Sequence, residues 1–346
     1  MEHKQARQVD HAPHGFLQTG QRNCYDMAGE IISCAETGQD GEYRRGLSWP
    51  EPRFEAVSDI VLDHLTGLAW TTNANLAEFP LMWQEALEFI LDMNRRKTYG
   101  FSDWRLPNRR ELRSLVSYET RRPALPQGHP FSNIFLGWYW TSTSAAINPA
   151  YAWYIHMEGA RLFYGRKDQY FLLWPVRGRS TVLPATGQRI CYDSAGVELP
   201  CGNTGQDGET TMGLTWPSPR FEVLDYSVID RLTGLRWLRK ASLSEEATSW
   251  PGSFDLVEQL NGNRAGDGLH WRLPCINELE SLVDCSTHSP ALPPGHPFTD
   301  VKDVYWSSTT SFFETDWAWA LYLTKGALGV GIKKEKNFFV WPVSDE

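Results

Sequence analysis

The chain has 346 residues, of which 41% are hydrophobic and 22% are charged, a composition typical of a folded globular protein rather than a disordered one. The formal net charge is −9, which argues against nucleic acid or an anionic membrane as the main partner, because both need a basic surface. No apolar run reaches the roughly 18 residues that a membrane-spanning helix needs, so we expect no membrane span.

The first residues, MEHKQARQVDHAPHGF, lack the apolar stretch of a signal peptide. The chain therefore either stays inside the cell or is a mature form from which a signal has been removed. Composition alone does not decide between these two. The cysteine pattern described below favours a secreted or cell-envelope protein whose signal has been removed.

The chain is a tandem duplication with a period of 167 residues. TGQRNCYD (19–26) returns as TGQRICYD (186–193), WPEPRFE (49–55) as WPSPRFE (216–222), and WRLPNRREL (104–112) as WRLPCINEL (271–279). Each unit, here called copy one and copy two, is long enough to bury a core of its own. The predicted organisation is an N-terminal extension at 1–18, a first domain at 19–177, a linker at 178–185 and a second domain at 186–346.

Each copy opens with a predicted β-hairpin. Gly29 lies midway between Cys24 and Cys34, and copy two repeats this arrangement. Glycine permits the positive φ of a tight turn, so a symmetric register places the two cysteines opposite each other. We expect disulfides Cys24–Cys34 and Cys191–Cys201, which favour an oxidising compartment. The alternative is two pairs of buried thiols.

Two further cysteines, Cys275 and Cys285, have no counterparts in copy one, where Asn108 and Tyr118 stand. Their joint presence suggests a pair. However, the segment between them is predicted to be helical, and ten residues of helix span roughly 15 Å. That distance is too long for a disulfide, so their role stays open.

The repeated phrase TGQDGE carries two acidic residues in each copy, Asp40 and Glu42 in copy one and Asp207 and Glu209 in copy two. An acidic glycine-containing turn could hold calcium through oxygen ligands. The phrase lacks the length and ligand density of an EF-hand loop, so a simple Asp-Gly turn is the favoured interpretation. Calcium is the only cofactor for which the sequence offers a candidate.

Two helices are predicted in each copy. The second of these helices follows WRLP. The Asn108 side chain can cap its N-terminus, and the Glu111 side chain can reach back to the Asn108 amide in a capping box. Because WRLP contains no nucleophile or metal-ligand set, we interpret it as scaffold rather than as a site. The first helix is marked in copy one by apolar residues at helical spacing: Trp83, Leu87, Ile90 and Met93.

Sixteen tryptophans suggest sugar stacking, but fourteen of them form seven pairs repeated between the copies. Residues kept in both copies are more simply explained by a shared core than by a shared ligand. Trp317 aligns with Tyr151 and so keeps an aromatic ring. Trp138 has no aromatic counterpart, which makes it a candidate ligand-facing residue, with local packing as the alternative.

From residue 138 onward, aromatic and polar residues alternate between glycines, which predicts short antiparallel strands. The expected fold is α+β, with two helices and a β-rich second half in each copy. In strand 151–158 one face matches copy two and the alternate face diverges, so we expect the divergent face to be exposed. Its candidate ligand-binding residues, besides Trp138, are Tyr154, His156, Arg161, Tyr164, Arg166 and Lys167 in copy one, and Tyr322, Lys325, Lys333, Lys334 and Lys336 in copy two. Sequence drift on a solvated face is the alternative explanation.

No catalytic constellation is recognisable. The sequence has no glycine-rich phosphate loop, no HExxH zinc helix and no GxSxG elbow. His129 and His296 recur within GHPF, where a hydrogen-bonded structural histidine is the favoured interpretation over a base or a metal ligand. We therefore expect a protein that is not an enzyme.

Taken in order, the motifs TGQ…CYD, TGQDGE, WPEPRF, LTGLAW, WRLPNRRELRSLV, YWTST and WPVR resemble the Lcl C-terminal domain family. This resemblance implies a bacterial, exported protein with adhesive and glycan-binding behaviour. The start of the WRLP helix is also similar to that of formylglycine-generating enzymes, which implies two tandem C-type-lectin-like domains. Their oxidase activity is not expected, because copy one has no cysteine after Cys34 and copy two has none after Cys285. The chain also lacks the Asn-Gly-Asp-Gly turn that many family members carry before LTGL, which puts any metal at that turn in doubt.

The function predicted at this point is that of a non-enzymatic extracellular or cell-envelope protein. It would bind a glycan, a protein surface or copies of itself through the divergent face that follows YWTST and YWSST. The alternative is a structural subunit of a self-assembling extracellular polymer or surface complex with no small ligand.

Overall fold

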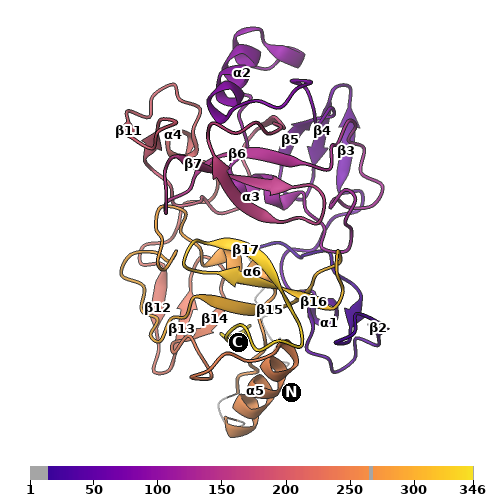
Figure 1. The fold of residues 1–346 in the computed structure, drawn as a ribbon, viewed down its shortest axis with the longest axis vertical. Coiled ribbons are helices and arrows are strands. Elements are labelled where there is room, and N and C mark those ends of the chain that lie inside the picture. The colour runs from indigo at the N-terminus through magenta and orange to yellow at the C-terminus, as the bar shows by residue number, and fades with distance from the viewer. Residues whose placement is uncertain (1–14, 265–267, 346) are drawn as a thin grey trace, which may run out of the picture.

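The computed structural model describes residues 15–264 and 268–345, so most of the predicted extension at 1–18 lies outside the described residues. The fold combines helices with antiparallel sheets, and the sheets predominate. Two repeated units follow one another along the chain (Figure 1). Within the described ranges, none of the helices combines the length and the apolar character that crossing a bilayer requires.

Copy one contains three α-helices, one 3-10 helix and nine strands among the described residues. In chain order they are β1 (Cys24–Tyr25), β2 (Ile31–Ile32), α1 (Asp40–Tyr43), β3 (Phe54–Val57), β4 (Ile60–Asp63), β5 (Leu68–Thr71), α2 (Trp83–Arg95), η1 (Thr98–Gly100), α3 (Arg109–Ser114), β6 (Trp138–Ser144), β7 (Tyr151–His156), β8 (Leu162–Arg166) and β9 (Val176–Arg177). The predicted helices correspond to α2 and α3, whereas the short helix α1 and the early strands β3 and β4 were not expected.

Copy two repeats this order. Its elements are β10 (Cys191–Tyr192), β11 (Glu198–Leu199), α4 (Asp207–Thr210), β12 (Phe221–Val223), β13 (Ser227–Asp230), β14 (Arg236–Leu238), α5 (Trp250–Asn263), α6 (Ile276–Ser281), β15 (Val304–Thr310), β16 (Trp317–Tyr322), β17 (Ala327–Ile332) and β18 (Val343–Ser344). Each copy also has a four-stranded sheet, β3-β4-β5-β9 in copy one and β12-β13-β14-β18 in copy two.

One antiparallel sheet of six strands runs through both copies in the order β15-β16-β17-β8-β7-β6. The two halves join where Leu328 of β17 pairs with Leu162 of β8. Helix α2 packs on one face of the copy-one half, where the Trp83 indole donates to the Thr141 carbonyl at 2.7 Å. The opposite face carries Trp153 and packs against α3.

The opening segments of the two copies are exchanged. The hydroxyl of Thr309 in β15 donates to the Asp40 carboxylate of α1 at 2.6 Å, and Thr143 in β6 donates to Asp207 of α4 at 2.7 Å. Figure 1 shows α1 and β2 beside the strands of copy two, and α4 and β11 beside those of copy one. The boundaries 19–177 and 186–346 therefore describe the repeat but not the packing, since each unit is completed by the other.

The segment predicted as a linker, 178–185, is part of this packing. Leu183 is buried in the main hydrophobic core, and its carbonyl accepts from the Leu214 amide at 2.8 Å. Residues Phe16 and Leu17, at the end of the predicted extension, are buried in the same core. That core contains residues of both copies, so the copies share one apolar interior.

At the junction of the copies, three arginines of copy one surround one glutamate of copy two. Glu280 lies 3.5 Å from Arg109, 3.4 Å from Arg110 and 3.3 Å from Arg113. Burial alone would raise the pKa of Glu280, but the three guanidinium groups outweigh it and lower the pKa. Arg110 also donates to the Val283 carbonyl just beyond the C-terminus of α6, where the helix dipole favours a cation.

The repeated tryptophans are core residues, as predicted. All but Trp49 and Trp216 are buried. Trp104 of WRLP is 2% exposed, and the Asn94 side chain holds its backbone by two hydrogen bonds of 2.7 Å. The Asn108 side chain accepts from the Arg110 and Glu111 amides, which confirms the predicted cap of α3.

Candidate functional site

The two predicted disulfides, Cys24–Cys34 and Cys191–Cys201, are present. The hairpin register pairs Cys24 with Ile32, so Cys34 lies two residues beyond β2 rather than opposite Cys24. The Cα atoms of Cys24 and Cys34 are nevertheless only 5.2 Å apart. Cys275 and Cys285 are both buried and form no disulfide.

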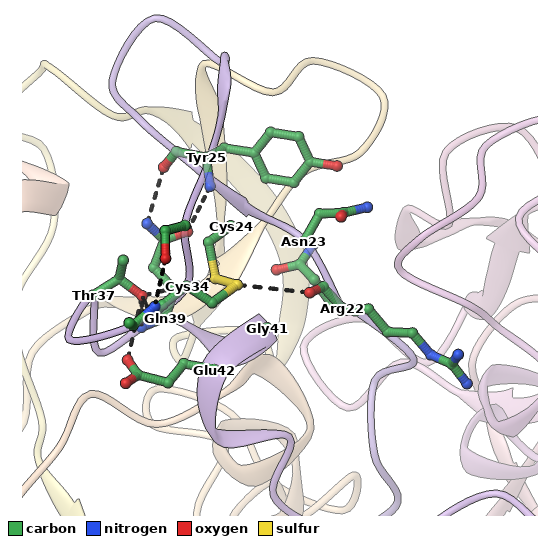
Figure 2. The surroundings of a disulfide bond; sticks show 12 residues. Arg22, Asn23, Cys24, Tyr25, Cys34, Thr37, Gln39, Gly41 and Glu42 are labelled. Atoms are coloured by element: carbon green, nitrogen blue, oxygen red, sulfur yellow. Dashed lines mark hydrogen bonds between the residues drawn. A yellow bond between two sulfur atoms is a disulfide. The ribbon is translucent and has the colours of Figure 1, made fainter.

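The TGQDGE phrase folds into the single-turn helix α1 instead of an Asp-Gly turn. Asp40 accepts from Thr19 and Thr309, and burial raises its pKa to about 6. Glu42 instead accepts from the Gly38 amide at 2.7 Å and from Thr37 beside the disulfide (Figure 2). In copy two, Asp207 and Glu209 make the equivalent contacts. The two acidic residues thus have separate structural partners.

These contacts bear directly on calcium. Among the described residues, no group of three or more His, Cys, Asp or Glu side chains is arranged to hold a metal ion. The calcium interpretation of Asp40, Glu42, Asp207 and Glu209 therefore gains no support from the structure. The TGQDGE segment instead connects the disulfide hairpin of one copy to the sheet of the other copy.

Lys333 and Lys167, predicted to lie on the exposed basic face, are buried, and the prediction was wrong for both. The Lys333 ammonium donates to the Asp26 carbonyl at 3.0 Å and lies 4.3 Å from the ring centre of Trp250. Lys167 contacts the Asp193 carbonyl and the Trp83 ring in the same way. Each lysine thus fastens the hairpin of the other copy.

We expect Lys333→Met to change how stability depends on pH. Burial lowers the pKa of Lys333 from 10.5 to about 7, against the opposing charges of Asp26 and Asp316. Between these two pKa values the unfolded chain binds more protons than the folded chain, so this lysine makes stability rise with pH. Urea unfolding from pH 7 to pH 10 should therefore show wild type gaining stability relative to the variant. A difference that stays constant with pH would contradict this, and the exposed Lys336→Met is the control.

Four aromatic side chains of copy one form what we call the aromatic platform: Trp138, Tyr154, His156 and Phe163. They lie on one sheet face across β6, β7 and β8, because Trp138 pairs with His156 and Tyr154 pairs with Phe163. The Trp138 ring centre is 4.3 Å from those of both Tyr154 and His156. Trp138, Tyr154 and His156 are half-buried, and Phe163 is 36% exposed.

The platform contains Trp138, Tyr154 and His156 of the predicted residues, but not Tyr164 or Arg166. Successive residues of a strand point to opposite faces, so Tyr164 and Arg166 start from the face of β8 opposite to that of Phe163. Tyr164 packs on the buried Trp153, with ring centres 5.1 Å apart. Arg166 is exposed and pairs with Asp168. The Tyr164 ring also stacks on that of Phe163, with ring centres 5.7 Å apart, so it borders the platform, and ligand contact by Tyr164 or Arg166 stays a prediction.

The remaining predicted residues lie around the platform or in copy two. Lys325 of copy two places its ammonium 5.3 Å from the Phe163 ring centre, and Arg161 is exposed and lies 3.9 Å from Glu314. Tyr322 is half-buried and stacks edge-on against Phe338. Phe163 was not predicted, although it lies two residues after Arg161 and so shares its strand face.

Part of the expected open face is covered. Trp140 and Ala152 are buried beneath α2, and Tyr154 packs at the edge of that cluster together with Phe171. The exposed part is therefore limited to the platform. The structural reason is that α2 crosses the same sheet face that the divergent residues occupy.

Two stretches of the chain, 59–177 and 226–344, match the model of the Lcl C-terminal domain. Together they cover more than half of the chain. They contain the platform but exclude the exchanged hairpins and the helices α1 and α4. Comparison with curated proteins finds no match.

Proposed function

The chain belongs to the Lcl C-terminal domain family, which suggests a surface or extracellular protein, and we propose that it is a non-enzymatic binding protein that works outside the cytoplasm. The two disulfides support this location, since such bonds persist mainly in oxidising compartments. We also propose that each unit is a C-type-lectin-like domain. What supports this finer description is the antiparallel sheet with α2 and α3 on its two faces in copy one.

The proposed ligand is a glycan, bound on the aromatic platform. The observation that supports it is the set of partly exposed rings on three adjacent strands, with Lys325 and Arg161 beside them. Aromatic rings offer a large apolar face at low entropic cost, and the neighbouring cations can hold polar groups of a ligand. Copy two carries Val304, Ala320 and Gly329 at three of the four equivalent positions, so we propose that only copy one uses this surface.

Replacing Trp138 by Val, the residue that copy two carries, should abolish glycan binding. We expect at least a tenfold loss of signal on a glycan array for Trp138→Val and for Phe163→Ala, because each variant removes a ring of the platform. Phe163 is partly exposed, so its replacement should change stability by less than about 1 kcal/mol. The control is Val223→Ala, an exposed residue of copy two. Unchanged binding by both platform variants would refute the assignment.

Self-assembly is the second candidate function, because partly exposed aromatic rings on one sheet face also suit contact with a second copy of the chain. Sedimentation velocity over a range of concentrations tests it with the same variants. Wild type that associates while Trp138→Val stays monomeric, without glycan binding by either, would favour the structural role. Monomeric wild type would exclude it.

A further inference from the structure

A groove with a volume of about 470 Å³ lies in copy one and shares no residue with the aromatic platform. Its walls come from the crossing segment at residues 20–22, from the WPEPRF phrase at 49–54 and from the two turns that follow α3. Two of these walls precede residue 59, where the match to the family domain begins. The volume falls in the usual range for sites that bind small molecules.

The groove presents both an unused acceptor and an unused donor. Glu51 is exposed and makes no hydrogen bond or ion pair with any described residue, and the same holds for the Arg22 guanidinium. Figure 2 shows the Arg22 side chain extending away from the disulfide hairpin. A carboxylate can only accept hydrogen bonds and a guanidinium can only donate them, so a ligand here must offer both kinds of partner.

A second carboxylate is fixed in the wall. Glu119 is half-buried and accepts from the Arg22 amide at 2.8 Å and from the Asn23 side chain. The exposed amide of Gln127, which can both donate and accept, lies on the opposite turn. Two carboxylates in one groove disfavour a polyanion, while Arg22 disfavours a polycation.

The aromatic wall of the groove does not offer a free ring for stacking. The Arg53 guanidinium lies 4.6 Å from the Trp49 ring centre, and a Cβ at Gly20 would be 2.4 Å from the same indole. Arg53 is itself held by two hydrogen bonds to Asp63. Trp49 is thus used as a packed wall, which disfavours a flat aromatic ligand.

We propose that this groove binds a short neutral saccharide. Sugar hydroxyls both donate and accept, so they can satisfy Arg22, Glu51 and Glu119 at once, and they carry no charge for the two carboxylates to repel. The proposal does not depend on the platform, because the two sites have no residue in common. If binding at the groove is refuted, the proposal for the platform is unaffected, and the reverse also holds.

Copy two provides a natural comparison. It keeps the equivalents of the arginine and the tryptophan, Arg189 and Trp216, but has Ser218 in place of Glu51 and Ser286 in place of Glu119. The framework is therefore repeated, but the carboxylates of Glu51 and Glu119 are lost and a different one, Asp284, stands in place of Ser117. We assign saccharide binding to copy one alone.

The test is saturation-transfer NMR on the full chain with three neutral probes: maltotriose, cellotriose and tri-N-acetylchitotriose. At least one probe should show saturation transfer, and Glu51→Ser, the copy-two residue, should weaken it at least tenfold. Glu51→Ser removes no hydrogen bond within the described residues, so it should keep the wild-type melting temperature. Arg22→Gln is the second variant, and Val223→Ala, at an exposed residue of copy two, is the control that should bind the probe normally. Trp138→Val is measured in parallel to show whether the probe binds on the platform instead.

Three results would overturn the proposal. The first is that none of the probes shows saturation transfer. The second is that Glu51→Ser and Arg22→Gln both bind like wild type, or that only Trp138→Val loses binding, which would move the saccharide to the platform. The third is displacement of the bound probe by equimolar heparin tetrasaccharide or by hexalysine, which would show a charged ligand to be preferred.

Discussion

Glu280→Gln should lower the free energy of unfolding by roughly 3–5 kcal/mol, because it takes away the carboxylate that three guanidinium groups, two of them fully buried, share. Arg109 and Arg110 are buried, and all three arginines lie within 3.5 Å of Glu280. Glutamine has almost the same shape, so the loss would report charge rather than packing. Urea unfolding at neutral pH measures it.

The matched control is Glu222→Gln, which removes an ion pair to Arg231 in which both side chains are 44% exposed. A pair this exposed contributes about 1 kcal/mol or less. Equal effects of the two substitutions would show that the buried cluster carries no special stability. An intact midpoint for Glu280→Gln would show that the arginines are compensated by the carbonyls they also contact.

The same cluster distinguishes the two copies at their junction. Where copy one has Arg109, Arg110 and Arg113, copy two has Ile276, Asn277 and Glu280. Two copies of unit one facing each other would oppose arginine with arginine, which disfavours that pairing. The charge difference therefore favours pairing of copy one with copy two over pairing of two copies of unit one.

Local features were predictable from the sequence because each depends on neighbouring residues. The disulfides follow from cysteine spacing, α2 from its apolar period, and the cap of α3 from Asn108 and Glu111. The exchange of opening segments was not predictable in this way. TGQDGE and the strand it contacts are nearly identical in both copies, so contacts within a copy and between copies look the same in sequence.

The errors on the candidate surface have a different cause. The outward face continues past a turn into β8, where the period of two groups Arg161 with Phe163 rather than with Tyr164 and Arg166. Lys333 could have been recognised, because Lys167 occupies the equivalent position in copy one within a segment that otherwise diverges. The same argument that assigned the repeated tryptophans to the core applies to this repeated lysine. Coverage of the sheet by α2, in contrast, is a tertiary contact that no local pattern reports.

Trp104→Ala should remove roughly 3–5 kcal/mol of stability, since it deletes a fully buried indole from a packed cluster. The Asn94 side chain donates to the Trp104 carbonyl and accepts from the Trp104 amide. The Trp104 ring is contacted edge-on by Tyr99 and Phe101, with ring centres 6.3 and 6.2 Å away. If WRLP is scaffold, the variant loses stability and does not selectively lose binding. A variant that kept its melting temperature and lost only ligand binding would instead make the phrase a site.

The same substitution tests whether the copies unfold together. Trp104 belongs to a cluster of copy-one residues, but the main core contains both copies, and their hairpins are exchanged. We therefore expect calorimetry to show a single transition that moves to lower temperature as a whole, and Trp271→Ala to move it in the same way. Phe79→Ala, at a side chain 70% exposed, is the control and should change stability by within about 0.5 kcal/mol. Two transitions, of which Trp104→Ala shifts only one, would mean that the exchanged segments do not couple the copies.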